Sequence, residues 1–343
     1  MDWLLRTDPN NLYPFAFVLP GGGILVIYYN EARILDEKTF ATIKTLPIIP
    51  GTVTSPAGRT YPMEGTAMLL PQYYPYTDPV EVIVCGGSAN GIALDNCARI
   101  QPEVEGAQWI VERMPSQRVM TIMTALPDGT YMIMGGAQQG VAGFGLATKP
   151  NLQAILYDPT QPKHQRFSIL GTTSVARLYH SEATLLHDGR VLVTGSDPED
   201  NLNPQEYRME VYIPPYLTAN RIQPSYTITN RDWTYNGLYN INVVLPQGPV
   251  ANMRISLLGA VSTTHGASFG QRTIFPKFTC NVNACTITAP TNAHVCPPGW
   301  YQLFVLDGPT PSNSQWVRIG GDPASLGNWP ADPAFSPPGM GPI

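Results

Sequence analysis

The sequence predicts an all-β protein in which an incomplete β-propeller is followed by a β-sandwich. Three observations predict this fold class. One hairpin unit recurs four times, the pattern then changes to short alternating strands, and proline (35) and glycine (31) are abundant along all 343 residues. Charged residues make up only 13% of the chain, against roughly 25% in an average globular domain. This turn-rich composition is typical of all-β proteins.

The propeller is predicted from the recurring unit, which consists of an apolar strand, a turn and a second apolar strand that ends near small residues. The copies cover residues 15–27, 66–87, 123–136 and 183–196. At residues 128–129 and 188–189 the turn contains Asp-Gly, and Asp-Gly between apolar runs is a strong hairpin signal. The copies are about 50 to 60 residues apart, which indicates kelch-type blades. Residues 154–158 and 209–212 supply outer strands.

The propeller ring is expected to be incomplete. Four copies are at the low end of the blade numbers that close a propeller, and the first copy begins within about fifteen residues of Met1. We therefore expect residues 1–218 to form a partial propeller, with the remaining blades upstream of Met1 in a longer protein. An uncovered blade edge would favour aggregation unless another segment or partner shields it.

The second domain is expected over residues 219–322, because the repeat stops near Pro214-Pro215. Short strands with alternating patterns are expected at 226–229, 239–244, 253–258, 285–289 and 300–306. About a hundred residues of such strands, separated by turns, indicate an immunoglobulin-like sandwich. Residues 323–343 contain six prolines and are expected to form a tail.

Composition and charge exclude several classes of partner. The net charge is −5, and no lysine and arginine cluster is present to follow a phosphate backbone, so we expect no nucleic-acid partner. No stretch of 18 apolar residues occurs, so we expect no membrane span. The first eight residues lack the basic and apolar regions of a signal peptide. We expect a monomer.

The five cysteines leave two interpretations open. Cys85 with Cys97, and Cys280 with Cys285, could each close a short loop, which would fit an oxidising compartment and leave Cys296 unpaired. Alternatively, all five are buried reduced thiols, because free cysteine is often a core residue.

Two segments contain candidates for chemistry. Tyr179 and His180 lie at the entry to the first strand of the fourth unit, and in a propeller this strand lines the central axis. Adjacent side chains on an extended strand point to opposite faces, so both rings reach the axis only if the strand entry is bent. His265 lies in a turn of the second domain, after an apolar strand.

These residue types suit a metal centre. Two imidazoles and a phenolate around an open position fit a tetragonal Cu(II) ion, and a bound cation lowers the pKa of a tyrosine ligand. The alternative is that Tyr179, His180 and His265 are ordinary strand and loop residues. The other histidines, His164, His187 and His294, lie in turns and are expected to face solvent.

Several segments carry a resemblance to one family. They are residues 10–15, 59–62, 118–120, 126–129, 135–140, 177–181, 264–265, 271–272, 297–301 and 303–306. The most specific are Arg177-Leu178-Tyr179-His180-Ser181 and Thr264-His265 with Gln271-Arg272. From about residue 10 to 320, the chain resembles the C-terminal part of glyoxal oxidase-type copper radical oxidases, which are relatives of galactose oxidase.

The resemblance implies a seven-bladed propeller with copper on its axis and an early-set sandwich. It implies that Tyr179 is the axial tyrosine and a proton acceptor from the substrate, and that His180 and His265 are the imidazole ligands. A second tyrosine, cross-linked to a cysteine, carries the organic radical in such enzymes. The implied reaction oxidises simple aldehydes or α-hydroxy carbonyls with O2 to carboxylic acids and H2O2, in an extracellular enzyme.

The chain departs from this pattern at the radical site. The radical tyrosine and its cysteine belong upstream of the segment 10–15, and no matching strand occurs in this chain. Tyr61 and Cys85 belong to later blades and are not assigned that role. We therefore expect a truncated chain that is inactive alone. The alternative is a non-catalytic propeller and sandwich module that binds carbohydrate or protein.

A glycosidase is a third interpretation that the sequence disfavours. Glycosidases need two carboxylates at a fixed separation. Asp128 and Asp188 are acidic residues of the repeat units, but hairpin turn geometry already explains their positions.

Overall fold

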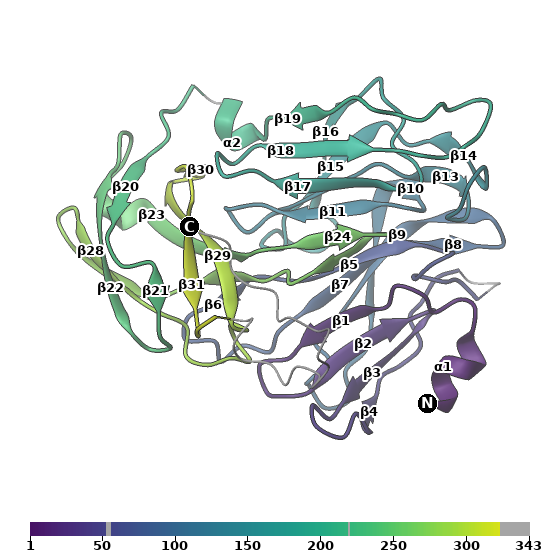
Figure 1. Cartoon of the computed structure of the whole chain (residues 1–343), viewed down its shortest axis with the longest axis horizontal. Coiled ribbons are helices and arrows are strands. Elements are labelled where there is room, and N and C mark those ends of the chain that lie inside the picture. Colours follow the sequence, from purple (N-terminus) through teal and green to yellow (C-terminus); the bar gives the residue numbers. More distant parts are fainter. Residues whose placement is uncertain (53–55, 219, 323–343) are drawn as a thin grey trace, which may run out of the picture.

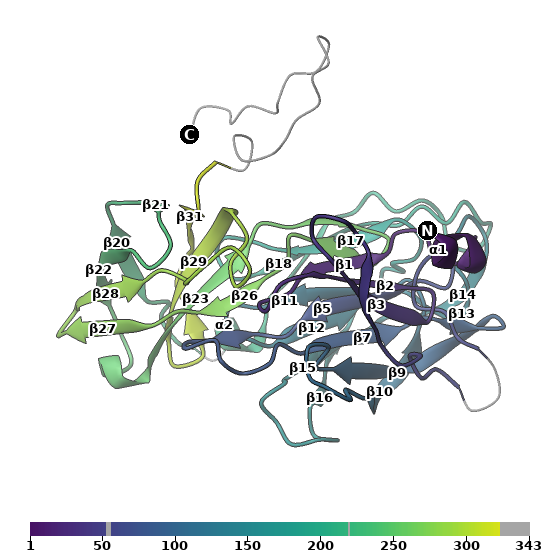
Figure 2. The ribbon, with the colours of Figure 1, turned by 90° about the horizontal axis from the view of Figure 1, so that it is seen from below.

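The computed structural model describes residues 1–52, 56–218 and 220–322. Within these residues the protein is nearly all-β, with a row of propeller blades on one side and a β-sandwich on the other (Figure 1). Helix α1 (Asp2–Thr7) lies far from the sandwich in both views (Figure 1, Figure 2). The predicted tail, residues 323–343, lies outside the described residues.

Each of the predicted hairpin units forms the inner part of one antiparallel blade. The first blade contains β1 (Phe15–Val18), β2 (Ile24–Tyr28), β3 (Glu31–Leu35) and β4 (Thr42–Thr45). The second contains β5 (Gly65–Leu69), β7 (Val82–Gly86), β9 (Ile92–Ile100) and β10 (Ile110–Arg118). The third contains β11 (Ile122–Ala125), β12 (Tyr131–Met134), β15 (Gln153–Tyr157) and β16 (Phe167–Thr172). The fourth contains β17 (Ser181–Leu185), β18 (Val191–Gly195) and β19 (Glu210–Tyr212). The predicted propeller fold is therefore confirmed.

Buried clusters between neighbouring blades hold the row together. Leu25 and Ile27 of the first blade pack with Val82 of the second, and further clusters join the second blade to the third and the third to the fourth. These side chains come from alternate positions of the strands, as expected for a sheet packed against its neighbour. Within the described residues the fourth blade has three strands, and its outer segment exposes Tyr207, Met209 and Val211.

The C-terminal part forms the predicted sandwich. One sheet contains β20 (Ser225–Ile228), β22 (Leu238–Val244), β28 (Ala284–Thr288) and β27 (Phe278–Asn281). The other contains β21 (Asp232–Trp233), β31 (Gln315–Ile319), β29 (Gly299–Asp307), β23 (Met253–Gly259), β26 (Thr273–Phe275) and β6 (Gln72–Tyr73), with β30 (Thr310–Pro311) beside β29. A core that includes Trp233, Tyr239 and Leu303 fills the space between the two sheets.

The two domains share β-sheet pairing. Strand β6 is a segment of the second blade, yet it pairs in parallel with β26 of the sandwich. A hairpin of the sandwich domain, β24 (Ser262–Thr264) and β25 (Ala267–Phe269), extends to the inner strand of the second blade, where β25 pairs in parallel with β5. The pairing of strands between the two domains was not predicted from the sequence.

The described residues contain two disulfides, Cys85–Cys97 and Cys280–Cys285, and one free cysteine, the buried Cys296. Each disulfide joins residues that lie directly opposite each other on neighbouring strands, β7 with β9 and β27 with β28. The short-loop pairing that the spacing allowed is therefore the one in the structure, and the alternative of five reduced thiols is wrong. No helix among the described residues is long and apolar enough to cross a membrane.

A buried arginine precedes the inner strand of three blades and fixes how the chain enters that strand. Arg59, Arg118 and Arg177 each donate to the carbonyl of the glycine at or just after the end of the second strand of the same blade. The glycines are Gly86, Gly135 and Gly195. Because a buried carbonyl must be paired, this contact joins the strand entry to its own blade.

Replacing Arg118 with methionine is expected to lower the free energy of unfolding by about 2–4 kcal/mol. Its guanidinium also donates to the carbonyl of Gln153, so one buried and one half-buried acceptor lose their partner, at about 1–3 kcal/mol each. The control is Arg113→Met on the same strand, where an exposed side chain pairs with Asp95 and the expected loss is about 0–1 kcal/mol. Equal urea midpoints for the two variants would contradict this role of Arg118.

Candidate metal centre

The centre forms at the hub, by which we mean the region bordered by the inner strands β1, β5, β11 and β17. The β24–β25 hairpin of the sandwich enters this region and lies beside β1, β5 and β17 (Figure 1). Thr264 pairs with Ala267 across a two-residue turn, in which His265 has φ 51° and Gly266 has φ 71°. Positive φ at both turn residues gives a type I′ turn, whose twist matches that of the strands. The turn places His265 in the hub.

The blade entries supply aromatic side chains at equivalent positions. Tyr61 and Tyr179 each follow the entry arginine of their blade by two residues, and Met120 does so in the third blade. Tyr13 has the corresponding place in the first blade, where Asn11 replaces the arginine. The side chain two residues after the entry arginine, or after Asn11 in the first blade, therefore comes from an equivalent position in every blade, and the propeller repeat brings these side chains to the region around His265.

The entry of the fourth blade is bent, as the metal-centre interpretation required. His180 has φ 61°, and β17 begins only at the next residue. Ser181 donates to the carbonyl of Leu178 from its backbone N–H (3.1 Å) and from its hydroxyl (2.6 Å), which closes a turn. As a result, the rings of Tyr179 and His180 stack at 3.8 Å between centroids instead of pointing to opposite faces.

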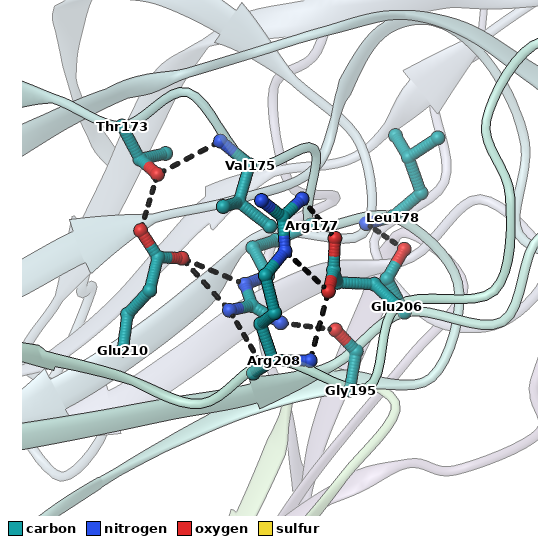
Figure 3. Close-up of polar contacts among 9 residues, drawn as sticks. Thr173, Val175, Arg177, Leu178, Gly195, Glu206, Arg208 and Glu210 are labelled. Atoms are coloured by element: carbon teal, nitrogen blue, oxygen red, sulfur yellow. Dashed lines mark hydrogen bonds and ion pairs between the residues drawn. The ribbon is translucent and has the colours of Figure 1, made fainter.

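Arg177 holds this bend in place (Figure 3). Its guanidinium donates to the carbonyls of Gly195 (2.7 Å) and Arg208 (2.8 Å), and to a carboxylate oxygen of Glu210 (2.8 Å). Thr173 donates to the other oxygen of Glu210, so that both carboxylate oxygens are paired. The segment that carries Tyr179 and His180 is thus tied to the outer strand of its blade.

The three predicted site residues lie together, although they come from two domains. The hydroxyl of Tyr179 is 3.4 Å from Nε2 of His265, and the imidazole centroids of His180 and His265 are 5.1 Å apart. Tyr179 is buried, His265 is half-buried and His180 is exposed. The arrangement brings one phenol and two imidazoles together, with the His180 side chain exposed.

This geometry fits a shared metal ion. Two donor atoms that each lie about 2.0–2.1 Å from one ion are about 2.9–3.4 Å apart, for angles between a right angle and the tetrahedral angle. The 3.4 Å between Tyr179 and His265 falls at the upper end of this range. The hydroxyl of Thr264 is 2.7 Å from Nδ1 of His265, which leaves Nε2 as the ligand nitrogen. The described part of the chain has no group of three or more His, Cys, Asp or Glu that could hold a metal ion, so an ion at this place would need Tyr179 as its third donor.

The surroundings favour neutral side chains at the centre. Burial lowers the pKa of His265, and the neighbouring His180 lowers it further, so the imidazole is in the form that binds metals. Burial raises the pKa of Tyr179 well above its usual range, and the neighbouring Tyr61 hydroxyl adds to this. A cation at the centre would offset this effect by favouring the phenolate.

Three aromatic residues that the sequence had not assigned to the site surround it. Tyr13 stacks on His265 at 3.8 Å and 8°, and Tyr61 meets the same imidazole edge-on at 5.6 Å. Phe144 meets Tyr179 edge-on at 5.1 Å and His180 at 5.6 Å. The repeat position could have identified Tyr13 and Tyr61. Phe144 has no such signal, because it lies in the turn between β13 (Ala137–Gly140) and β14 (Ala147–Pro150).

The remaining histidines lie away from the centre. His164 and His187 are exposed in turns, as predicted. His294 is only half-exposed, and its Nε2 is 2.8 Å from a carboxylate oxygen of Glu37 in the first blade. The prediction of a fully solvent-facing side chain is therefore only partly correct for His294.

Comparison with known proteins gives the family. Residues 3–216 match the family model described as "Glyoxal oxidase N-terminus", and residues 223–319 match "Galactose oxidase-like, Early set domain". A WSC domain-containing protein of Arthroderma benhamiae is 61% identical over 99% of this chain and 37% of its own length. Aldehyde oxidase GLOX1 of Arabidopsis thaliana is 32% identical over 91% of this chain and 55% of its own length. Aldehyde oxidase GLOX of Vitis pseudoreticulata is 31% identical over 90% of this chain and 62% of its own length.

A solved structure confirms the fold. It is described as a fungal alcohol oxidase of the AA5 family in complex with copper, and it superposes with a TM-score of 0.65 at 18% identity. The match covers 90% of this chain and 76% of that chain. The chain spans between 37% and 62% of the length of the three relatives from Arthroderma, Arabidopsis and Vitis. Because the first family model matches residues 3–216, the chain belongs to the glyoxal oxidase family, with a galactose oxidase-like early-set domain after its propeller.

Proposed function

We propose that the protein is a glyoxal oxidase-like copper radical oxidase that acts on simple aldehydes or α-hydroxy carbonyls. The observation that carries this proposal is the convergence of Tyr179, His180 and His265 at the hub. Two imidazoles and a phenol are a donor set that suits Cu(II). In the overall reaction, an aldehyde, water and O2 give a carboxylic acid and H2O2, so two electrons and two protons pass from the aldehyde hydrate to oxygen.

The residues of the centre have separate roles in this proposal. Copper, when bound, supplies a one-electron redox couple and a position that polarises the substrate oxygen. Nε2 of His265 and a ring nitrogen of His180 would hold the ion. The hydroxyl oxygen of Tyr179 would be the base that takes the proton of the substrate hydroxyl, because a bound cation favours its phenolate form. Phe144, 49% exposed beside both Tyr179 and His180, limits the space for the substrate.

We further propose that the radical tyrosine and its cysteine belong to a part of the ring that these 343 residues do not contain, so that the chain alone is inactive. The described residues form four blades in a row (Figure 1). Cys85 and Cys97 are bonded to each other, and Cys296 is buried in the sandwich core, so none of them is available to a hub tyrosine. The curated relatives are also longer than this chain.

We also propose a location, partners and an oligomeric state for the protein. Two disulfides among the described residues suit an oxidising compartment, which supports an extracellular location. The proposed partners are a small aldehyde and O2, and the proposed working form is a monomer. A binding module for carbohydrate or protein is the second candidate, and it is favoured by the exposed aromatic rings of Tyr13 (39%) and Phe144 (49%) beside the hub.

The proposal is tested by loading the chain with Cu(II) and measuring H2O2 release from methylglyoxal. We expect tight copper binding without peroxide release by the 343-residue chain, and release by a longer protein that contains the missing blades. Failure of the chain to bind copper would favour the binding-module alternative. Steady peroxide release by the chain alone would show that a radical partner exists within it.

Replacing Thr264 with valine is expected to weaken Cu(II) binding by about 10-fold. Valine keeps the shape of the side chain but removes the hydroxyl that lies 2.7 Å from Nδ1 of His265, and loss of such a partner typically costs 10- to 100-fold in metal affinity. A competition titration with a chelator measures the change. Thr264→Ser keeps the hydroxyl and should bind copper like the unmodified chain. Equal weakening by both variants would show that the hydroxyl is not the cause.

A further inference from the structure

A cavity of about 190 Å³ lies between the second and third blades. It is lined by residues of the segment 70–81 and Gln101 from the second blade, and by Pro159 and Thr160 from the third. The segment 70–81 follows the inner strand β5. The other end of β5 adjoins the metal centre, because the carbonyl oxygen of Gly65 lies next to Gly266 of the His265 turn. A strand of this length spans about 16 Å, so the cavity lies at the opposite end of the second blade from the candidate metal ligands.

Tyr73 forms an aromatic wall of this cavity. It lies on β6 and pairs with Phe275 of the sandwich, and the two rings stack at 4.7 Å and 10°. Phe275 is buried, and the hydroxyl of Tyr73 lies next to Gly129 of the third blade, so both ends of the tyrosine side chain are held. Phe275 covers only one face of the ring, and Tyr73 is still 43% exposed. The protein therefore offers a flat ring that is already fixed in place, which lowers the entropic cost of binding a ligand on it.

Two polar side chains of the cavity are free to bind a ligand. Neither the carboxylate of Asp78 nor the side-chain amide of Gln101 forms a hydrogen bond with any residue that the structure describes. By contrast, the carboxylate of Glu81 accepts from Arg99 at 2.9 Å. A carboxylate accepts hydrogen bonds from hydroxyl groups, and a primary amide both donates and accepts them. The cavity thus combines an aromatic face with groups that bind hydroxyls, and a sugar ring needs both.

We propose that this cavity binds a neutral β-1,4-linked glycan, with one sugar ring stacked on Tyr73 and its hydroxyls bound by Asp78 and Gln101. The hydroxyls of such a sugar are equatorial, so its two faces consist of C–H groups, which pack on the electron-rich face of an aromatic ring. The cavity is smaller than the roughly 300–1,000 Å³ of sites that enclose drug-sized ligands. It therefore takes a single sugar ring and leaves the rest of the glycan on the surface.

The charges of the cavity favour a neutral sugar over an acidic one. Asp78 and Glu81 line it, whereas no lysine or arginine among the described residues does. A uronic acid would bring a further carboxylate next to Asp78, and like charges in contact oppose binding. A glycan bound here would hold the protein by the end of the blades that is away from the metal centre. This inference does not rest on the proposed copper chemistry.

The test titrates the full chain with cellohexaose, a soluble neutral β-1,4-glucan, and with a galacturonic acid oligomer of the same length. Isothermal titration calorimetry gives the dissociation constant, and circular dichroism checks the fold of each variant. The variants are Tyr73→Ala, Tyr73→Phe and Asp78→Ala. Tyr207→Ala is the matched control, because Tyr207 is a tyrosine that is 81% exposed next to β19 of the fourth blade.

We expect cellohexaose to bind and the acidic oligomer not to bind. Tyr73→Ala should raise the dissociation constant for cellohexaose by about 10-fold, because it removes the stacking surface. Asp78→Ala should raise it by a similar factor through the loss of charged hydrogen bonds. Tyr73→Phe keeps the ring, so it should bind like the unmodified chain, and so should Tyr207→Ala. If Tyr73→Ala does not fold, the decision rests on Asp78→Ala, whose exposed side chain supports no other residue.

Three results would overturn the inference. They are no binding of cellohexaose, equal binding of the acidic oligomer, and an unchanged dissociation constant in both Tyr73→Ala and Asp78→Ala. The last of these would place any glycan site elsewhere on the protein. None of the titrations contains copper, so a failure here leaves the proposed oxidase function intact, and a chain that binds no copper can still bind the glycan.

Discussion

Replacing His265 with alanine is expected to abolish copper binding by the protein. The change removes one of two nitrogen ligands, and it removes the ligand that the sandwich domain delivers to the hub. The remaining donors, Tyr179 and His180, are adjacent in the sequence and stack on each other, so they occupy one side of the centre only. The loss should exceed about 100-fold in affinity, since changes to residues that merely orient a ligand already cost 10- to 100-fold.

Thermal unfolding with and without Cu(II) gives an independent measure of this loss. A ligand that binds only the folded state, at 100 times its dissociation constant, stabilises that state by about 2.7 kcal/mol. The unmodified chain should gain this stability, and His265→Ala should gain none. His187→Ala is the control, because His187 is exposed in a turn of the fourth blade. A His265→Ala protein that keeps copper with unchanged affinity would refute the ligand assignment.

The blades could be predicted because their signals are local. The unit predicted at residues 123–136 is β11 and β12, joined by the Asp128-Gly129 turn, and here alternation, turn residues and length agree. The predicted sandwich strand at 253–258 is β23. Each depends on neighbours within about ten residues, so the pattern alone specifies it. Helix α1 was not predicted, because its six residues are too short for a helical period to be recognised.

The site could be predicted only in part, because its geometry depends on contacts between distant segments. The strand entry at Tyr179-His180 was recognised, but the positive φ of His180 that brings both rings together has no signature in the residue types. The pairing of β25 with β5 joins residues about two hundred positions apart. Tyr13 and Phe144 reach the centre through loops whose paths depend on such contacts. Alignment of the four blade entries would have identified Tyr13, since it occupies the position of Tyr179.

Gly266→Ala is expected to be among the most destabilising single substitutions in the hub. A Cβ at this position would lie 2.0 Å from the carbonyl oxygen of Gly65 in the second blade and 3.3 Å from that of Thr121. Both obstacles are backbone atoms, so neither can rotate away. The φ of 71° adds a second penalty, since left-handed backbone costs about 1–2 kcal/mol for residues other than glycine.

The chain contains a matched control for the backbone part of this effect. Asn90 and Gly91 form a two-residue turn between β8 (Ser88–Ala89) and β9, with φ 50° and 76°, so the turn has the same form as His265-Gly266. A Cβ on Gly91 would meet nothing within 4 Å. Gly91→Ala should therefore cost about 1–2 kcal/mol, from the backbone conformation alone.

The difference between the two variants isolates the close approach of the hairpin to the second blade. Overpacking typically costs about 1–3 kcal/mol, so Gly266→Ala should lose about 2 kcal/mol more than Gly91→Ala in urea unfolding. It should also weaken copper binding, because relief of the clash requires the turn that carries His265 to move out of the hub. Equal losses in stability for the two variants would mean that the hairpin tip is not wedged against Gly65. Unchanged copper affinity in Gly266→Ala would mean that the position of this turn does not set the metal centre.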